Sequence, residues 1–143
     1  MAFPDRIERV VELGHPPSKV WAALTTAEGL GTWFGQEASI DLRPGGAGEL
    51  KWDNGFRQYL RVERVEEPRV FGFTWRIYGL PDDDPRRTYV EFTLEPDGEG
   101  TRLTVVETGF AQLPDDTHRE AFGGNTGGWA RELDELAGYL DAA

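Results

Sequence analysis

The feature that most constrains the fold is a change in the spacing of apolar residues near residue 110. Before it, apolar and polar residues alternate over short runs separated by Gly, Pro, Asn and Asp, which is typical of half-buried β-strands. After it, apolar residues recur at intervals of three and four, which predicts one face of a long helix. The predicted strands span residues 7–13, 39–42, 48–52, 57–65, 70–78, 88–95 and 101–108, and the helical face comprises Phe122, Thr126, Trp129, Leu133, Leu136 and Leu140.

Short turns connect the predicted strands. Residues 53–55 (DNG) form a strong hairpin signal, and residues 96–100 (PDGEG) return the chain over a similarly short path. Connections of this length join antiparallel neighbours, so we expect an antiparallel meander. A twisted sheet with one buried face requires a cover, and only the C-terminal helix is long and amphipathic enough to supply it. The predicted fold class is therefore α+β, with a curved antiparallel sheet of about six to seven strands around a long C-terminal helix.

Two short helices are predicted between the first two strands. Residues 25–28 (TTAE) offer a capping box, in which a Thr side chain accepts from free backbone N–H groups and Glu28 reaches back. The second short helix follows this box, carries Leu30, Trp33 and Phe34, and stops near Gly35. A second capping box, residues 117–120 (THRE), marks the start of the long helix.

Four glycines interrupt the first half of the long helix: Gly123, Gly124, Gly127 and Gly128. Each costs about 1 kcal/mol relative to Ala in a helix interior. One interpretation is local bending or close packing of the helix backbone. The other is that the missing side chains leave room under the sheet for a ligand.

Composition excludes several classes of function. A chain of 143 residues suits one domain, so residues 1–143 are expected to form a single domain. The net charge of −11, with no basic stripe, argues against nucleic acid as a partner. The sequence lacks a long apolar run and a signal peptide, so we expect a cytoplasmic protein with no membrane span. It also lacks cysteine, which excludes thiolate chemistry and disulfides, and we expect neither a metal nor a cofactor.

The aromatic content points to the interior. Aromatic residues make up 12% of the chain and include five Trp, which indicates either a densely packed core or a cavity with aromatic walls. Alternation places one set of these side chains on the inner face of the sheet. The candidate cavity residues are Trp33, Phe34, Leu50, Trp52, Leu60, Phe71, Phe73, Trp75, Val90, Phe92, Leu103, Val105, Glu107, Phe122, Thr126 and Trp129, with Trp33 and Phe34 flanking the mouth.

Glu107 is the most informative polar residue. It follows Leu103 and Val105 by alternation onto the inner face, where a carboxylate must be hydrogen-bonded, paired with a cation or protonated. The structural interpretation is a link to an Arg or to a backbone group. The functional interpretation is a polar contact for a ligand hydroxyl or an acid–base group, which makes Glu107 the one weak catalytic candidate.

Established catalytic and metal-binding motifs are missing. The sequence has no GxSxG, P-loop, dinucleotide-binding or HExxH motif. Its two histidines, His15 and His118, are expected to be solvated residues of a turn and of a first helical turn. The acidic residues 82–84 are expected to lie in a solvated loop without a metal.

Several segments resemble a known superfamily. Residues 17–26 (PSKVWAALTT) with residues 33–35 (WFG) look like the opening of the SRPBCC (START-like, helix-grip) superfamily, and more narrowly of the activator of heat-shock-protein-90 ATPase homologue family. Further pieces that resemble it are PGG at 44–46, Pro68 with FTW at 73–75, GTRLT at 100–104, GF at 109–110, and Gly128-Trp129 followed by Leu133, Leu136 and Leu140.

The resemblance implies a hydrophobic cavity between the sheet and the long helix, which different members use for lipids, sterols, polyketides or aromatic compounds. The co-chaperones that give the family its name carry an additional domain absent here, so their activity is not transferred.

Three functions follow as hypotheses. The first is a binding protein that holds a hydrophobic, lipid-like, polyketide-like or aromatic ligand between the sheet and the helix. The second is a cyclase or hydrolase that uses the same cavity, with Glu107, Thr126 and Tyr59 as weak candidates for acid–base chemistry. The third is a stress-linked or chaperone-associated module with a protein partner. The expected oligomeric state is a monomer or a weak dimer.

Overall fold

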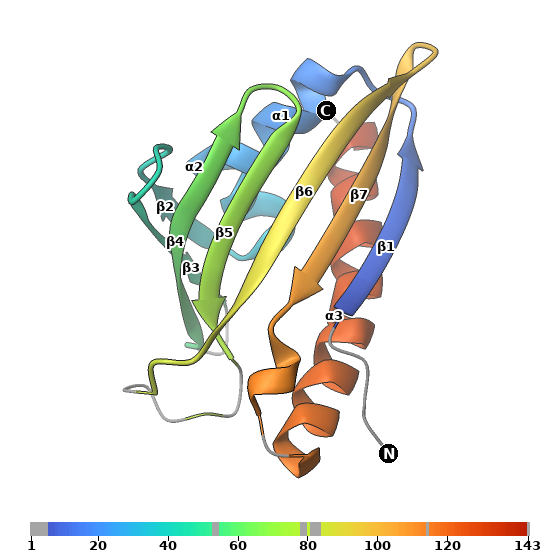
Figure 1. Ribbon diagram of the computed structural model, residues 1–143. Coiled ribbons are helices and arrows are strands. Elements are labelled where there is room, and N and C mark those ends of the chain that lie inside the picture. Colours follow the sequence, from blue (N-terminus) through green and yellow to red (C-terminus); the bar gives the residue numbers. More distant parts are fainter. Residues whose placement is uncertain (1–5, 53–54, 78–79, 81–83, 114, 143) are drawn as a thin grey trace.

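The computed structural model describes residues 6–52, 55–77, 80, 84–113 and 115–142, with the backbone alone for residues 111 and 115–120. Seven strands form one sheet, and a long helix lies against its inner face (Figure 1). The elements in chain order are β1 (Arg6–Leu13), α1 (Pro17–Thr25), α2 (Ala27–Gly29), η1 (Leu30–Phe34), β2 (Glu37–Ile40), β3 (Ala47–Lys51), β4 (Arg57–Glu66), β5 (Val70–Arg76), β6 (Arg87–Asp97), β7 (Gly100–Thr108), η2 (Phe110–Gln112) and α3 (Asp115–Ala142).

The sheet is an antiparallel meander with one addition. Strands β2 to β7 pair in sequence order, as the short turns predicted, and β1 pairs with β7 at the edge opposite β2. The α+β fold class, with its long C-terminal helix and the short helices after the first strand, is confirmed. The first strand, β1, thus lies beside β7, and α3 lies behind β1 and β7 (Figure 1).

Side chains alternate between the two faces of the sheet as predicted. In β6, Val90, Phe92 and Leu94 are buried and the residues between them are half-buried, and β7 likewise alternates between buried and more exposed residues. In β4 the register shifts between Val62 and Arg64, where the strand carries one extra residue. Alternation is lost there because a bulge turns two successive side chains to the same side.

Helix α3 supplies the cover for the inner face. Trp129, Leu133, Leu136 and Leu140 are all buried, so the predicted helical face is the packed one. The predicted start at the second capping box is wrong, because the helix begins at Asp115 and residues 117–120 lie within it.

The first capping box is confirmed in part. The hydroxyl of Thr26 accepts a hydrogen bond from the N–H of Gly29 at 3.0 Å, which caps α2. The backbone N–H of Thr26 donates to the carbonyl of Ala22, at the end of α1, so Glu28 is not needed to satisfy it. The chain continues directly from α2 into η1, a π-helical turn that ends where the N–H of Gly35 bonds to Leu30.

The structure contradicts two of the roles predicted for the four glycines of α3, namely close backbone packing and room for a ligand under the sheet. Gly123, Gly124 and Gly127 are exposed and Gly128 is half-buried. A methyl group at any of them would meet no described atom within 4 Å. They therefore neither pack closely against another backbone nor lie under the sheet.

Candidate functional site

The predicted cavity residues form two groups in the structure. Most of them make up the packed core between the sheet and α3. Phe71, Val90, Phe92 and Leu103 expose 0% of their surface. These four side chains have no surface that water can reach. A ligand between them would therefore have to separate residues that are in contact. The remaining core members of the predicted set are Leu50, Leu60, Phe73, Trp75, Val105, Glu107 and Trp129, all buried.

Aromatic rings fill the centre of this core. The rings of Trp75 and Trp129 stack at 5.7 Å between centroids, which joins β5 to α3. Phe34 meets Trp129 edge-on at 5.7 Å, and Phe92 meets the same ring at 5.7 Å. Edge-to-face and offset contacts at these distances are the favourable arrangements of aromatic pairs.

Glu107 lies under these rings and is fully buried. Its carboxylate accepts hydrogen bonds from the indole nitrogens of Trp75 and Trp129, both at 2.9 Å. It also accepts from the hydroxyl of Thr88 at 2.5 Å. The side-chain amide of Asn125 lies 2.9 and 3.0 Å from its two oxygens and donates to them. None of these four partners carries a charge. Dipoles from two strands and one helix thus compensate the buried carboxylate, which corrects the expectation of an Arg or a backbone partner.

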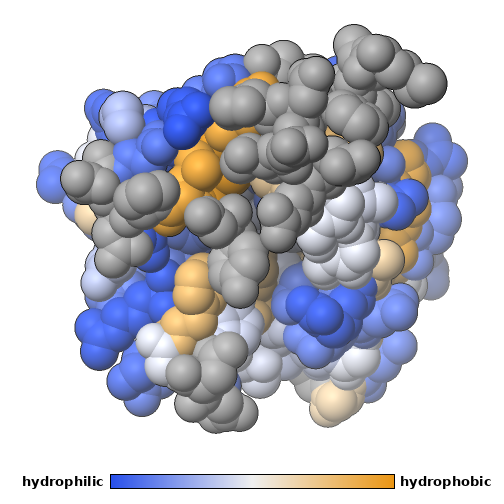
Figure 2. Space-filling model, turned by 90° about the horizontal axis from the view of Figure 1, so that it is seen from below, coloured by the Kyte–Doolittle hydropathy of each residue, from blue (hydrophilic) through white to orange (hydrophobic). Residues whose placement is uncertain are grey.

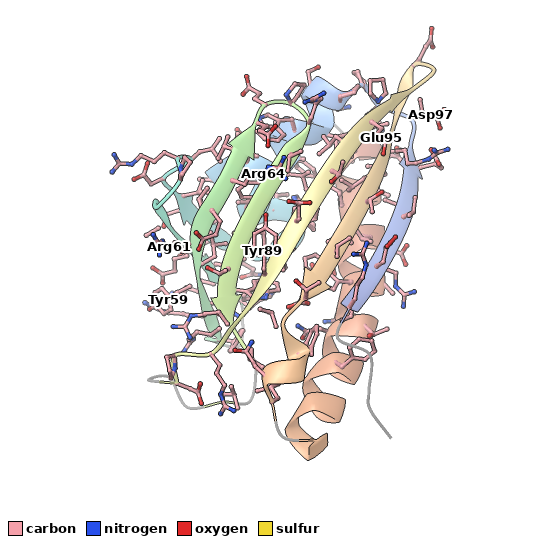
Figure 3. The ribbon with its side chains drawn as sticks, in the orientation of Figure 1. Tyr59, Arg61, Arg64, Tyr89, Glu95 and Asp97 are labelled. Carbon is pink, nitrogen blue, oxygen red and sulfur yellow. The ribbon has the colours of Figure 1, made fainter. Side chains whose placement is uncertain are left out.

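The three residues considered for catalysis do not converge on one site. Glu107 is enclosed by its hydrogen-bond partners, and Thr126 donates its hydroxyl to the carbonyl of Phe122 within α3. Tyr59 projects from the outer face of the sheet (Figure 3), where Arg76 lies over its ring at 5.4 Å. Phe122 is half-buried and packs against Phe110 at 5.4 Å.

A cleft lies beside this core, between η1 and the C-terminal half of α3. Its volume is about 760 Å³, and it is open to solvent. Trp33 and Phe34 stack at 4.8 Å on one side of it, and Trp52 meets Phe34 edge-on at 5.9 Å. The cleft is lined by Thr32, Trp33, Phe34, Gly35, Gln36, Trp52, Arg131, Glu132, Glu135, Tyr139 and Ala142. Three predicted cavity residues, Trp33, Phe34 and Trp52, therefore line this opening.

Glu132 is the unusual polar residue of the cleft. Its exposed fraction is 8%, and its Oε2 has no hydrogen-bond partner among the described residues. The nearest cation is Arg131, whose Nε lies 3.9 Å from Oε1 and whose side chain is 71% exposed. Burial, together with the neighbouring Glu135 carboxyl, raises the pKa of Glu132 to about 8.

Sequence reasoning missed two polar residues of α3, although a signal was present. Asn125 and Glu132 lie four residues before and three residues after Trp129, so both fall on its helical face. A polar residue at a core position of an amphipathic helix indicates either a buried hydrogen bond or a ligand-binding site. The cleft face of α3, with Glu135 and Tyr139, is adjacent to the core face and gave no such signal.

The other predicted polar residues lie elsewhere. His15 is not free in solvent, because its ring bonds to Asp141 at 2.7 Å and lies 3.2 Å from Lys19 Nζ. Asp84 is paired with Arg86, which lowers the pKa of that carboxyl to about 2. The side chain of His118 and residues 53, 54, 82 and 83 lie outside the described residues.

The described surface is mainly polar. Figure 2 shows hydrophilic residues over much of one end, with hydrophobic residues in smaller areas. Tyr59, Arg61, Arg64 and Tyr89 stand on the outer face of the sheet (Figure 3), and Val10 and Tyr59 are the large hydrophobic residues that are strongly exposed in the described part of the chain. No helix within the described ranges has the length and apolarity that a membrane crossing requires. Among the described side chains, no three of His, Cys, Asp or Glu are placed to hold a metal ion.

Known structures share this arrangement. Protein MLL2253 from Mesorhizobium loti is 29% identical with a TM-score of 0.83, over 96% of this chain and 98% of that one. DynU16, described as a protein in the dynemicin biosynthetic locus, is 24% identical with a TM-score of 0.80; the match covers 96% of this chain but 48% of DynU16. The Aha1 dimer from Colwellia psychrerythraea has the same fold at 19% identity and a TM-score of 0.77, over 94% of this chain and 95% of that one.

Family comparison agrees with the resemblance of residues 17–26 and 33–35. No curated protein matches the sequence significantly. The family model described as "Activator of Hsp90 ATPase homolog 1-like protein" matches residues 14–141, which include the short helices, the strands β2 to β7 and nearly all of α3. This chain belongs to the family of Activator of Hsp90 ATPase homolog 1-like proteins, within the SRPBCC helix-grip fold.

Proposed function

We propose that this protein binds a small, largely apolar aromatic molecule in the cleft between η1 and α3. The observation that carries the proposal is the cleft itself, about 760 Å³ with Trp33, Phe34 and Trp52 on its walls. Ligand sites typically have volumes of about 300–1,000 Å³, mainly apolar or aromatic walls and a few polar groups that fix orientation. Thr32, Gln36 and Glu132 supply such polar groups.

The burial of individual side chains favours the cleft as the ligand site, rather than the space between the sheet and α3. The core side chains Phe71, Phe92 and Leu103 have no exposed surface, whereas Trp52 is half-buried. A ligand in the cleft covers the ring surface of Trp52 that solvent already reaches, and each Å² of apolar surface covered contributes about 25 cal/mol. A ligand in the core would first have to separate packed rings.

Binding is favoured over catalysis by the placement of the acid–base candidates. Catalysis needs a nucleophile or an acid–base pair within hydrogen-bond reach of one reacting atom. Glu107 is enclosed, Thr126 bonds within its own helix, and Tyr59 lies on the far face of the sheet.

The test is a titration with three naphthyl probes that differ in charge: naphthylmethanol, naphthylmethylamine and naphthoate. We expect at least one of them to bind saturably, and Trp52→Ala to weaken that binding by about five-fold or more through the lost ring contact. Tyr59→Ala is the matched control, since it removes an aromatic ring that is 48% exposed on the other face, and it should leave the affinity unchanged. If no probe binds, or if both variants behave alike, the proposal is wrong.

A further inference from the structure

We infer that the cleft selects organic cations, and that Glu132 is the residue that receives the ammonium group of an aromatic amine. This inference rests on the proposed function, because it assigns a chemical class to the ligand of the same cleft. It combines three features of the structure, namely a buried carboxyl oxygen without a hydrogen-bond partner, aromatic walls and a deficit of positive charge once Glu132 is ionised.

The first feature is the unpartnered oxygen. Glu132 is more than nine-tenths buried and lines the cleft, yet its Oε2 has no hydrogen-bond partner among the described residues. A buried polar atom without a partner carries a desolvation cost that a donor from a ligand removes. Because the terminal torsion of a glutamate is broad, either carboxyl oxygen can turn to the cleft.

The second feature is the aromatic lining. Trp52 and Tyr139 line the same cleft as Glu132, with Trp33 and Phe34 stacked beside them. The faces of Trp, Tyr and Phe attract cations such as ammonium groups, and they also cover the apolar body of an aromatic amine. An inorganic divalent cation would instead require several oxygen ligands in one shell, and the described residues offer no such group.

The third feature is the balance of charge. The charged and titratable groups that α3 places in the cleft are Arg131, Glu132, Glu135 and Tyr139. From the opposite wall come Thr32 and Gln36, which are uncharged. The guanidinium of Arg131 is 71% exposed, so solvent screens its interaction with Oε1, 3.9 Å away. Once Glu132 is ionised, two carboxylates stand against this one screened cation, and an ammonium group from a ligand balances the charge.

Proton release follows from this arrangement. Glu132 keeps its proton at neutral pH in the empty cleft, since burial and Glu135 raise its pKa to about 8. An ammonium group favours the ionised carboxylate, so its binding expels that proton to the buffer. A neutral ligand that only covers the aromatic walls expels none.

The experiment compares naphthylmethylamine with naphthylmethanol, which have the same ring and differ in the charged group. Calorimetric titration at neutral pH in two buffers of different ionisation enthalpy gives the affinity and the number of protons released. In the wild type we expect the amine to bind about ten-fold more tightly than the alcohol, with release of a sizeable fraction of one proton.

Two variants assign the effect to Glu132. In Glu132→Gln the preference for the amine and the proton release should both disappear, while the alcohol still binds. In Asp134→Asn, an exposed position of α3 outside the cleft, both should persist.

The remaining outcomes separate the two proposals. Equal affinity of the amine and the alcohol, with binding still sensitive to Trp52→Ala, overturns the inference and leaves the proposed function standing. Binding of neither the amine nor the alcohol overturns the inference, and it overturns the proposed function as well if naphthoate also fails to bind. Amine preference that survives Glu132→Gln shows that another group receives the cation and also overturns the inference.

Discussion

The indole nitrogen of Trp129 donates a hydrogen bond to Oε1 of Glu107 at 2.9 Å, which joins the middle of α3 to strand β7. The other oxygen of the same carboxylate accepts from Trp75 of β5, so one buried side chain connects three elements. The rings of Trp75 and Trp129 also stack on each other, with 5.7 Å between their centroids. The interior is thereby fixed by directional contacts as well as by apolar packing.

Replacement of Glu107 by Gln should destabilise the protein strongly. All described partners of Glu107 are donors, and the NH₂ group of Gln would face at least one of them without an acceptor. We expect the free energy of unfolding to fall by about 2–4 kcal/mol, as measured by chemical denaturation.

Glu95→Gln is the control for this prediction. Glu95 lies in β6 with an exposed side chain, so its replacement should change the free energy of unfolding by less than about 0.5 kcal/mol. Equal stability of Glu107→Gln and the wild type would show that the hydrogen bonds to Glu107 contribute little to folding.

Much of the interior could be predicted from the sequence, because alternation has a fixed period. The alternation that places Leu103 and Val105 on the inner face of the sheet also places Glu107 there, and all three residues are buried in the structure. Its partners could not be predicted, since Trp75 and Trp129 are 32 and 22 residues away along the chain. Contacts of that range depend on strand order and on the rotation of α3 about its axis, which no local pattern specifies.

The titration of Glu132 should make stability depend on pH in a defined window. Its ordinary pKa of 4.5 applies in the unfolded chain, whereas in the folded protein the pKa is raised to about 8. Between these values the folded state binds more protons, so the stabilising effect present at low pH is lost as the pH rises. Replacement by Gln removes this titration.

The measurement is the free energy of unfolding of Glu132→Gln minus that of the wild type, across the pH range. Because the cleft is open to solvent, we expect the difference to rise by only about 1–2 kcal/mol between about pH 5 and about pH 9. Taking the difference cancels the titration of the other carboxyl groups. A difference that stays flat, or falls, would contradict the raised pKa.

The glycines of α3 predict a stabilising substitution. Gly124 is exposed, and an added methyl group would meet no described atom within 4 Å. Gly124→Ala should therefore raise the free energy of unfolding by about 0.5–1 kcal/mol, because Ala loses less backbone entropy in a helix.

Gly29→Ala is the opposite case. There the methyl group would lie 2.5 Å from the carbonyl oxygen of Ala23, and this backbone atom cannot move aside easily. The midpoint temperature of thermal unfolding should be higher for Gly124→Ala, and lower for Gly29→Ala, than for the wild type. Destabilisation by Gly124→Ala would mean that this part of α3 contacts a group outside the described residues.

The cleft was harder to predict than the fold. Its aromatic wall could be anticipated from Trp33 and Phe34 at the end of a short helix. Its other wall could not, because Glu135 and Tyr139 belong to a polar face of α3 that the periodicity assigns to solvent. Only the packing of η1 against α3 turns that face into one side of a cleft.

The most direct test of the binding site uses the indole N–H signals of the five tryptophans during titration with the naphthyl probe that binds best. A ligand in the cleft should shift the signal of Trp52 most, because Trp52 is half-buried, whereas Trp33 is 2% exposed and its indole nitrogen donates to the carbonyl of Ala23. The signals of Trp75 and Trp129, which are hydrogen-bonded to Glu107, should move less, as should that of Trp21, which is bonded to Glu67. If Trp75 and Trp129 instead shift most, the ligand enters between the sheet and α3, and the cleft is not its site.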